Sequence, residues 1–236
     1  MGTQRIHHNP VYHEQTGVFA DRAEAGEQLA GLLGQTKLTR PLVLAIPAGG
    51  VPVAASLANH LQVPLDVAVV SKITLPWNSE AGYGAVAFDG SCSLNHDLIR
   101  RANLRDQVVE AGIQTTREKV QHRQQLFRQD RPMPMLAGRD VIVVDDGLAS
   151  GLTLQVAVLA LRRAGADRLL LAVPTAHDAA ARQLAHTVEA LFCVNLRSGW
   201  SYSVAAAYRH WHDISEADAK LILLQHRQPT EVTDRN

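Results

Sequence analysis

Residues 141–153 are the part of this chain whose residue types and spacing could do chemistry. Four apolar residues at 141–144 predict a buried strand. Asp145 and Asp146 follow directly, and Gly-Leu-Ala-Ser-Gly-Leu-Thr then runs to Thr153. Carboxylates bind hydroxyls or a metal-bound group, whereas small residues let backbone N–H groups approach an anion closely. The stretch therefore predicts a site for a ligand with both hydroxyls and phosphate, such as a sugar phosphate.

Two familiar nucleotide motifs are excluded here. Leu152 follows Gly151 where an ATPase-type P-loop has Lys and then Ser or Thr, and the chain contains no G-x-G-x-x-G. The helix expected after Gly151 would add favourable partial charge for an anion, and Ser150 and Thr153 could donate hydroxyl bonds. An Asp-rich turn before a helix is the alternative, but turn chemistry alone does not account for the whole combination.

Predicted strands and helices must position the residues at 145–153. Apolar runs predict strands at 42–46, 65–70, 141–144, 168–173 and 188–194, and helical periodicity predicts helices at 51–61, 152–164 and 178–186. This alternation is typical of a doubly wound, mostly parallel α/β sheet. Ligands bind such sheets at the carboxyl ends of their strands, where Asp145 and Asp146 stand.

The other segments are less regular. Residues 1–18 are polar and predict an arm or a poorly ordered lead-in, and a helix with Asp21 as its N-cap follows, which Gly34 can end. Residues 71–85 show no helical or strand period, which indicates a functional or mobile loop. A hairpin is expected at 85–94 around Asp89-Gly90, a long polar helix at 97–129 and a final helix at 215–225.

Composition narrows the class of protein. The 236 residues contain 23 Lys plus Arg and 23 Asp plus Glu, and this zero balance argues against binding nucleic acid through an overall field. No run of 18 apolar residues could span a membrane, and the first residues lack the apolar centre of a secretory signal. Cys92 and Cys193 are too few for a disulfide framework or a zinc quartet. We expect a cytoplasmic protein with one domain.

The motif at 145–153 resembles the ribose-phosphate signature of type I phosphoribosyltransferases. It looks most like a bacterial group of predicted phosphoribosyltransferases without a defined acceptor, in which Pro-x-Gly-Gly-Val (here 47–51), Lys72 with 76–80, and 144–149 occur in this order. The resemblance implies a Rossmann-like core over about 40–195, a mobile loop at 71–85, an insertion at 85–131 and a hood at 196–228. It also implies phosphoribosyl pyrophosphate as substrate, Mg²⁺ as cofactor and a homodimer.

The resemblance also implies roles for particular residues. Asp145 and Asp146 would contact the ribose and could hold the metal, directly or through water. The phosphoribose site would comprise Asp145, Asp146, Gly147, Leu148, Ala149, Ser150, Gly151 and Thr153. The pyrophosphate site would comprise Ala48, Gly49, Gly50 and Lys72. We take Asp145, Asp146, Lys72 and Glu80 as the catalytic candidates.

Three positions differ from related sequences. Ala48 and Ser71 stand where relatives carry Arg, so two cations expected near pyrophosphate are missing from those positions. Those purine-type members that use a loop Asp as a base carry it at this chain's position 149. This chain has Ala149 there, as the adenine and orotate types have Ala. The acid–base group must then come from elsewhere, and Glu80 in the loop is the best candidate. The alternative for Lys72 and Glu80 is that both are solvated loop residues.

Aromatic residues gather after the last predicted core strand. Trp200, Tyr202, Tyr208 and Trp211 fall within this short segment, with Arg197 before them and Asp213 after them. By the resemblance, Arg197, Trp200 and Asp213 would bind the acceptor in the hood, where an aromatic base could stack. The alternative is a small satellite core under the helix at 215–225.

Two classes of function fit these observations. The first is an enzyme that transfers 5-phosphoribose to an unidentified, nucleobase-like acceptor with release of pyrophosphate. The second is a sugar-phosphate or nucleotide-binding regulatory protein that has lost turnover, which Ala48 and Ser71 motivate. Phosphate-ester hydrolysis or phosphorolysis ranks last, because the chain lacks a recognisable phosphatase nucleophile motif.

Overall fold

A six-stranded parallel sheet lies at the centre of the protein, in a computed structural model that describes residues 6–129 and 131–226. Its strands run in the order β1-β9-β8-β7-β2-β3. They span Ile6–His8 (β1), Ala190–Arg197 (β9), Arg168–His177 (β8), Asp140–Val144 (β7), Leu42–Ala45 (β2) and Leu65–Val67 (β3). Each neighbouring pair is parallel. The predicted mostly parallel α/β fold is therefore confirmed.

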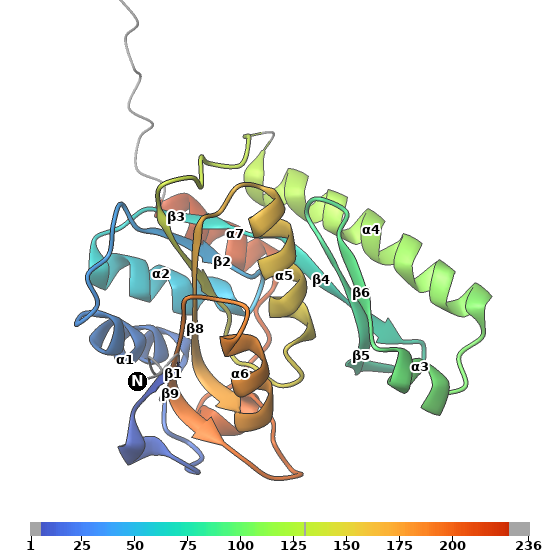
Figure 1. The fold of residues 1–236 in the computed structure, drawn as a ribbon, viewed down its shortest axis with the longest axis horizontal. Helices are drawn as coiled ribbons and strands as arrows, with labels where there is room; N and C mark the ends of the chain where they lie inside the picture. Colours follow the sequence, from blue (N-terminus) through green and yellow to red (C-terminus); the bar gives the residue numbers. More distant parts are fainter. Residues whose placement is uncertain (1–5, 130, 227–236) are drawn as a thin grey trace, which may run out of the picture.

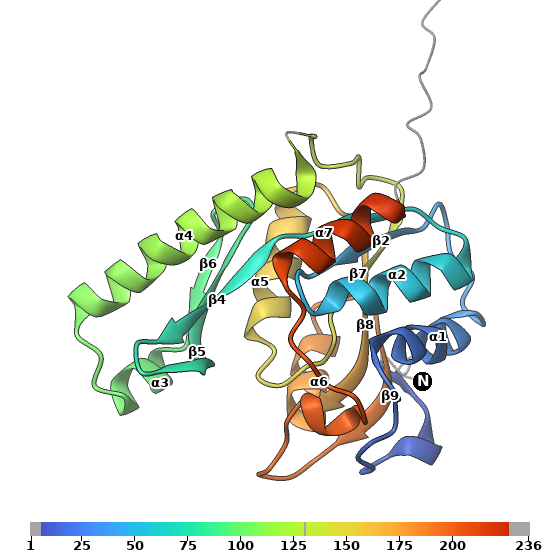
Figure 2. The same ribbon diagram turned by 180° about the vertical axis from the view of Figure 1, so that it is seen from behind.

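Helices cover both faces of this sheet. Those on one face are α1 (Arg22–Leu33), α2 (Gly50–Leu61) and α7 (Glu216–Gln225), and those on the other are α5 (Leu152–Arg163) and α6 (Asp178–Ala185). Figure 1 looks onto α5 and α6, and Figure 2 looks onto α1, α2 and α7. Within β2, Val43 and Ala45 pack toward the first layer, and Leu42 and Leu44 toward the second. A strand buried on both faces must be continuously apolar, and for this reason the apolar runs in the sequence predicted the core strands.

An arm formed by residues 70–128 projects from one side of the core (Figures 1 and 2). It contains the antiparallel strands β4 (Val70–Leu75), β5 (Asn78–Ala87) and β6 (Cys92–Leu94), followed by α3 (His96–Arg101) and α4 (Asp106–Arg128). The long helix α4 packs along β4 and β5. The hairpin predicted around Asp89-Gly90 is formed by β5 and β6, and Asp89-Gly90 lies in the turn between them.

The prediction of an irregular loop at 71–85 is wrong, because these residues form most of the β4–β5 hairpin. The turn between the strands falls at Pro76 and Trp77. Register shifts on either side of Thr74 disturb the pairing of β4 with β5. Such irregularities break the period-2 pattern by which a strand is recognised in sequence. Whether the segment moves stays a prediction.

Two predicted elements are divided in the structure. The strand predicted at 65–70 stays in the central sheet as β3 through Val67, and the chain enters the arm as β4 from Val70. The helix predicted at 97–129 is α3 and α4, which are separated at 102–105. Asn103 there has a left-handed φ of 49°, which a continuous helix does not permit. The final helix is α7, with Ser215 as its N-cap.

Residues 6–18 are more ordered than predicted, and residues 1–5 of the predicted lead-in lie outside the described residues. Ile6–His8 form β1, which pairs in parallel with β9, and the His7 ring stacks on Phe192 at 4.7 Å. Pro10–Tyr12 form a short 3₁₀ helix, and the buried Asn195 amide donates to the carbonyls of Tyr12 and Gln15. The strand pairing, ring stacking and hydrogen bonds fix this N-terminal segment, which its polar composition had predicted to be an arm or poorly ordered. Asp21 caps α1 as predicted, through the N–H groups of residues 23 and 24.

Across the described residues, no helix combines the length and apolar character that crossing a bilayer would require.

Candidate functional site

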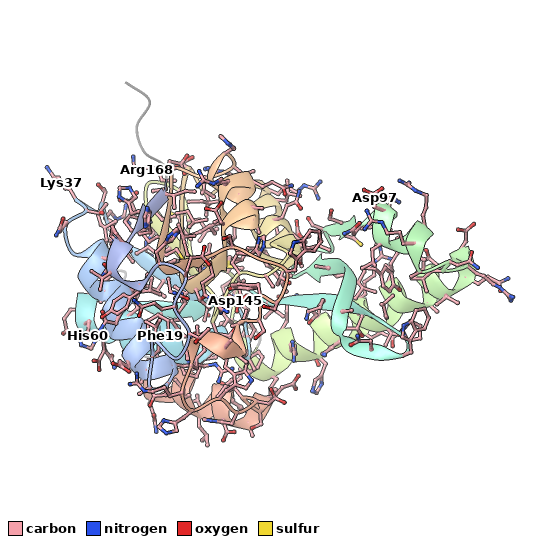
Figure 3. The ribbon with its side chains drawn as sticks, turned by 90° about the horizontal axis from the view of Figure 1, so that it is seen from below. Phe19, Lys37, His60, Asp97, Asp145 and Arg168 are labelled. Carbon is pink, nitrogen blue, oxygen red and sulfur yellow. The ribbon has the colours of Figure 1, made fainter. Side chains whose placement is uncertain are left out.

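A cavity of about 420 Å³ lies at the carboxyl end of β7, where the core meets the arm. Figure 3 shows Asp145 in this central position, between the sheet and the start of the arm. The core contributes Asp145, Asp146, Gly147, Leu148, Ala149, Ser150, Gly151, Thr153 and Leu154 to its walls. The remaining wall residues are Lys72, Ala81, Gly82, Leu98 and Val204. All eight residues predicted for phosphoribose, together with Lys72, therefore surround one cavity.

The two acids at the end of β7 lie in an environment that disfavours their charge. Asp145 Oδ1 accepts a hydrogen bond of 2.9 Å from the backbone N–H of Asp146. Burial, and then the neighbouring Asp146 carboxylate, raise the pKa of Asp145 well above its usual range. Burial likewise raises the pKa of Asp146, and Arg22 opposes that shift. A cation brought by a ligand would stabilise the ionised pair.

Arg22, the first residue of α1, binds the second of these acids. Its Nε and Nη2 donate to Asp146 Oδ2 at 3.0 and 2.9 Å, and its Nη1 donates to the carbonyl of His212 at 2.8 Å. The guanidinium lies 3.9 Å from the ring centre of Trp211, which is a cation–π contact. Tyr208 donates from its hydroxyl to the backbone carbonyl of Asp146 at 2.6 Å. Arg22 thus fixes one carboxylate oxygen and leaves Oδ1 for other contacts.

The turn at 48–50 packs directly against the acidic pair. A Cβ placed on Gly49 would lie 2.2 Å from Asp146 Oδ2, and one on Gly50 would lie 2.8 Å from the Asp145 Cα. Any larger residue would push the turn away from the acids. The Pro47–Ala48 peptide is cis. Ala48, Gly49 and Gly50 touch the site from the side of α2 but do not line the cavity described above.

The loop at 147–153 leads from the acids into α5. Its middle is tied to β8, because Leu148 N–H donates to the Thr175 carbonyl and the Leu148 carbonyl accepts from His177 N–H. Gly151 has a φ of 80°, a conformation that favours glycine. As the N-cap of α5 it offers no side chain to the helix, so the first N–H groups of α5 can receive an anionic ligand.

Lys72 and Glu80 both belong to the hairpin of the arm. Lys72 lines the cavity, and its side chain passes so close to Gly82 that a Cβ there would lie 2.2 Å from Lys72 Cγ. The backbone of Glu80 lies in β5, but its side chain is outside the described part of the structure. A catalytic role for Glu80 stays a prediction.

The three residues predicted for the acceptor are dispersed. Arg197, at the end of β9, is buried; it donates to the Ser203 carbonyl and lies 5.1 Å from the ring centre of Tyr202. Trp200 and Asp213 are exposed. Within the described ranges, the cavity walls include none of these three, and Val204 is the wall residue from this segment. Their acceptor role stays a prediction.

Two of the aromatic residues instead pack with Phe19 and Arg22. Tyr208 lies between Phe19 and Trp211, at ring-centre distances of 5.5 and 5.2 Å. Phe19 and Tyr208 belong to the same apolar layer as α1, α2 and α7, whereas Trp211 is exposed, so these rings extend the main core and do not form the separate satellite core that was the alternative. Sequence reasoning missed Arg22, because its partner is 124 residues away and no local pattern marks the arginine.

A magnesium ion would have a small set of ligands here. The described residues contain no cluster of three or more His, Cys, Asp or Glu side chains suited to a metal. Mg²⁺ commonly uses one or two carboxylates and completes its shell with water and substrate phosphates. Asp145 and Asp146 fit that mode, since they are adjacent and line one cavity together with most of the 147–153 loop.

The chain matches known proteins along most of its length. The sequence model of the phosphoribosyl transferase domain matches residues 89–207. Two curated proteins of Mycobacterium tuberculosis are each 35% identical over 206 residues, which are 87% of this chain and 46% of theirs. Both are named "Putative phosphoribosyl transferase". The chain thus spans about half the length of these relatives.

The fold is also shared with a solved structure. The crystal structure of TT1426 from Thermus thermophilus superposes with a TM-score of 0.69 and is 33% identical in sequence. The match covers 89% of this chain and 99% of that one. The similarity therefore includes both the core and most of the remaining chain.

Proposed function

The chain belongs to the phosphoribosyltransferase family, and we propose that it transfers 5-phosphoribose from phosphoribosyl pyrophosphate to a nucleobase-like acceptor, with Mg²⁺ and with release of pyrophosphate. One observation carries this proposal: Asp145 and Asp146 share a cavity with every residue of the 147–153 loop except Leu152. The carboxylates suit ribose hydroxyls, and the loop with the α5 N-terminus suits a phosphate. A sugar phosphate carries both kinds of group in one molecule.

The two ends of the donor would meet different parts of the site. The 5-phosphate would lie in the 147–153 loop, where Ser150 and Thr153 add hydroxyl donors to the backbone N–H groups. The pyrophosphate would face Lys72 and the turn that contains Gly49 and Gly50. Charge on the leaving group grows as its bond to the sugar breaks, so cations and N–H donors there would stabilise the transition state more than the ground state.

The reaction exchanges one bond at C1 of the ribose. The electron pair of the C1–O bond leaves with pyrophosphate, and a lone pair of the acceptor forms the new bond to C1. The acceptor loses one proton, for which Glu80 is the candidate base. Asp145 and Asp146 would stabilise the positive charge that develops on the sugar. Mg²⁺, when bound, would supply charge neutralisation of the phosphates.

Binding of the donor tests the proposal directly. Titration calorimetry with the Mg²⁺ complex of phosphoribosyl pyrophosphate should show binding to the wild-type protein. It should show little or none to Asp145→Asn or Asp146→Asn, which preserve side-chain size and remove the charge. Circular dichroism would show that both variants remain folded. The absence of binding to the folded wild type at millimolar donor would overturn the proposal.

A regulatory protein that binds the same ligands without turnover is the second candidate. The observation in its favour is that Ala48 and Ser71 bring no positive charge to the pyrophosphate side. It predicts donor or nucleotide binding, but no pyrophosphate release with any acceptor. A coupled assay of pyrophosphate release across a panel of nucleobases separates the two, because release with a single acceptor excludes this candidate. A gain of activity in Ala48→Arg would favour it.

A further inference from the structure

Arg123 lies where the arm joins the core, at the point where α4 passes both β4 and α7. Its Nη1 donates a hydrogen bond of 3.2 Å to Ser71 Oγ, and its Nε donates one of 2.7 Å to Glu216 Oε1. The Arg123 side chain is only 14% exposed. Ser71, whose own side chain carries no charge, is therefore in direct contact with a guanidinium supplied by another element.

Positive charge exceeds negative charge around this contact. Burial lowers the pKa of Lys119, and Arg123 and Lys72 lower it further, whereas Glu216 acts in the opposite direction. Two further cations, Arg123 and Lys72, and one carboxylate, Glu216, thus lie within electrostatic reach of Lys119. His122 stands 3.8 Å from the second Glu216 oxygen and adds charge only when protonated. Gathering like charges in a partly desolvated place is unfavourable, and an anionic ligand would relieve it.

This group of charges adjoins the candidate site through the strand itself. Ser71 and Lys72 are neighbours on β4, and Lys72 lines the cavity and acts electrostatically on Asp145. Successive side chains of a strand point to opposite faces. Cations therefore stand on both sides of β4 at the place where it leaves the core.

A short segment joins the same group to the acidic pair. The His212 carbonyl binds Arg22, which holds Asp146, and Glu216 binds Arg123. The four peptide units from 212 to 216 span at most about 14 Å. The helix α7 that follows packs on α2, which starts at the 48–50 turn. Arg123 is thus anchored on the pyrophosphate side of the proposed site.

We propose that Arg123, with Lys119 beside it, forms the cationic wall of the pyrophosphate subsite and supplies the positive charge that Ser71 lacks. The inference rests on the proposed function and assigns the anion that this part of the site takes. In the free protein Glu216 balances Arg123. A bound pyrophosphate would share that guanidinium with Glu216, whose carboxylate therefore opposes binding.

Two ligands that differ in the pyrophosphate group test this subsite separately from the rest of the site. Calorimetry would compare the Mg²⁺ complex of phosphoribosyl pyrophosphate with ribose 5-phosphate, which lacks the pyrophosphate. Arg123→Gln should weaken binding of the first by roughly ten- to a hundredfold, the range for loss of a charge-assisted bond, and leave the second unchanged. Glu216→Gln should strengthen binding of the first several-fold, because it removes the opposing charge.

Arg123→Gln and Glu216→Gln should change the affinity for the donor in opposite directions. This difference distinguishes a binding role from a structural ion pair. Arg162→Gln is the matched control. Arg162 lies near the C-terminal end of α5, and its replacement breaks a contact of 2.9 Å to Glu189 and removes the same charge. It should leave both affinities unchanged. If the wild type binds both ligands and Arg123→Gln preserves the ratio of their affinities, the inference is overturned while the proposed function stands. If folded wild type binds neither ligand, the proposed function fails first.

Discussion

Arg22 and Asp146 form an ion pair across 124 residues of sequence, with two guanidinium nitrogens 3.0 and 2.9 Å from the same carboxylate oxygen. The side chains are 6% and 17% exposed, so the pair is largely withdrawn from water. Trp211 covers the guanidinium, and the His212 carbonyl accepts a hydrogen bond from its third nitrogen. One residue therefore joins α1, the end of β7 and the segment before α7.

Removing this arginine should destabilise the protein and leave a buried carboxylate without its partner. We expect Arg22→Gln to lower the free energy of unfolding by about 3 kcal/mol, the lower end of what breaking a buried pair costs. Arg22→Lys should cost less, because it keeps the charge but cannot place two nitrogens on one oxygen. Urea denaturation measures both. A loss below about 0.5 kcal/mol in Arg22→Gln, the usual range for surface substitutions, would contradict this interpretation.

The acidic pair should reduce the stability of the ligand-free protein at neutral pH. The pKa of Asp145 is raised in the folded state by burial and by Asp146. Stability from such a group is fully present below the unfolded pKa of about 4 and is lost as the pH rises through the raised folded pKa. Asp145→Asn should therefore melt higher than the wild type at pH 7, by about 2–4 °C for each kcal/mol gained.

Melting curves recorded from pH 4 to 8 with a chelator present test this expectation. The difference between Asp145→Asn and the wild type should shrink toward pH 4, where the wild-type carboxyl is protonated in the folded state and about half protonated in the unfolded state. The variant should at the same time lose donor binding. An equal melting temperature at every pH would show that burial does not penalise the charge of Asp145.

The close approach of the 48–50 turn to the acids predicts a sharp steric effect. A methyl group at residue 49 would meet Asp146 Oδ2 at 2.2 Å, so Gly49→Ala must displace the turn or the carboxylate. We expect a loss of about 1–3 kcal/mol in stability, as for other overpacked sites, together with weaker donor binding. Urea denaturation and calorimetry measure the two effects.

Gly31→Ala is the control for that substitution. Gly31 lies inside α1, and apart from its chain neighbours and the surrounding helix backbone, a Cβ there meets no atom of the described residues within 4 Å. Alanine favours a helix over glycine by about 1 kcal/mol, so this variant should gain stability and bind the donor normally. If both variants behave alike, the tight contact at Gly49 does not determine the outcome.

The core of the fold could be predicted because local patterns and burial agree there. The run at 42–45 is apolar throughout because it is buried on both faces, and Asp21 caps α1 through its own neighbours. The loop at 147–153 was recognised because its residues are contiguous in sequence, and all of them except Leu152 line one cavity in space. Chemistry that is local in sequence needs no tertiary information.

Features that depend on distant partners could not be predicted. Arg22 and Arg123 look like ordinary helix arginines until Asp146 and Ser71, 124 and 52 residues away, are placed beside them. The strand β1 has three residues and exists through its pairing with β9. The β4–β5 hairpin lacks a clear period because register shifts accompany its turn at Pro76. The two arginines and β1 are settled by tertiary contacts, which override weak local preferences, whereas the hairpin is settled by irregular pairing between its own two strands.

The arm offers a test of whether a glycine serves packing. Gly112 lies inside α4, where a Cβ would come within 2.0 Å of the buried Tyr83 hydroxyl oxygen. Gly112→Ala should therefore destabilise the protein despite the better helix propensity of alanine. Tyr83→Phe removes the clashing oxygen, so Gly112→Ala should cost less in that background, where the nearest side-chain atom to the new Cβ is Ile73 Cγ2 at 3.1 Å. A double-mutant cycle by urea denaturation measures this coupling, and additive effects would mean that α4 and β5 do not meet as described.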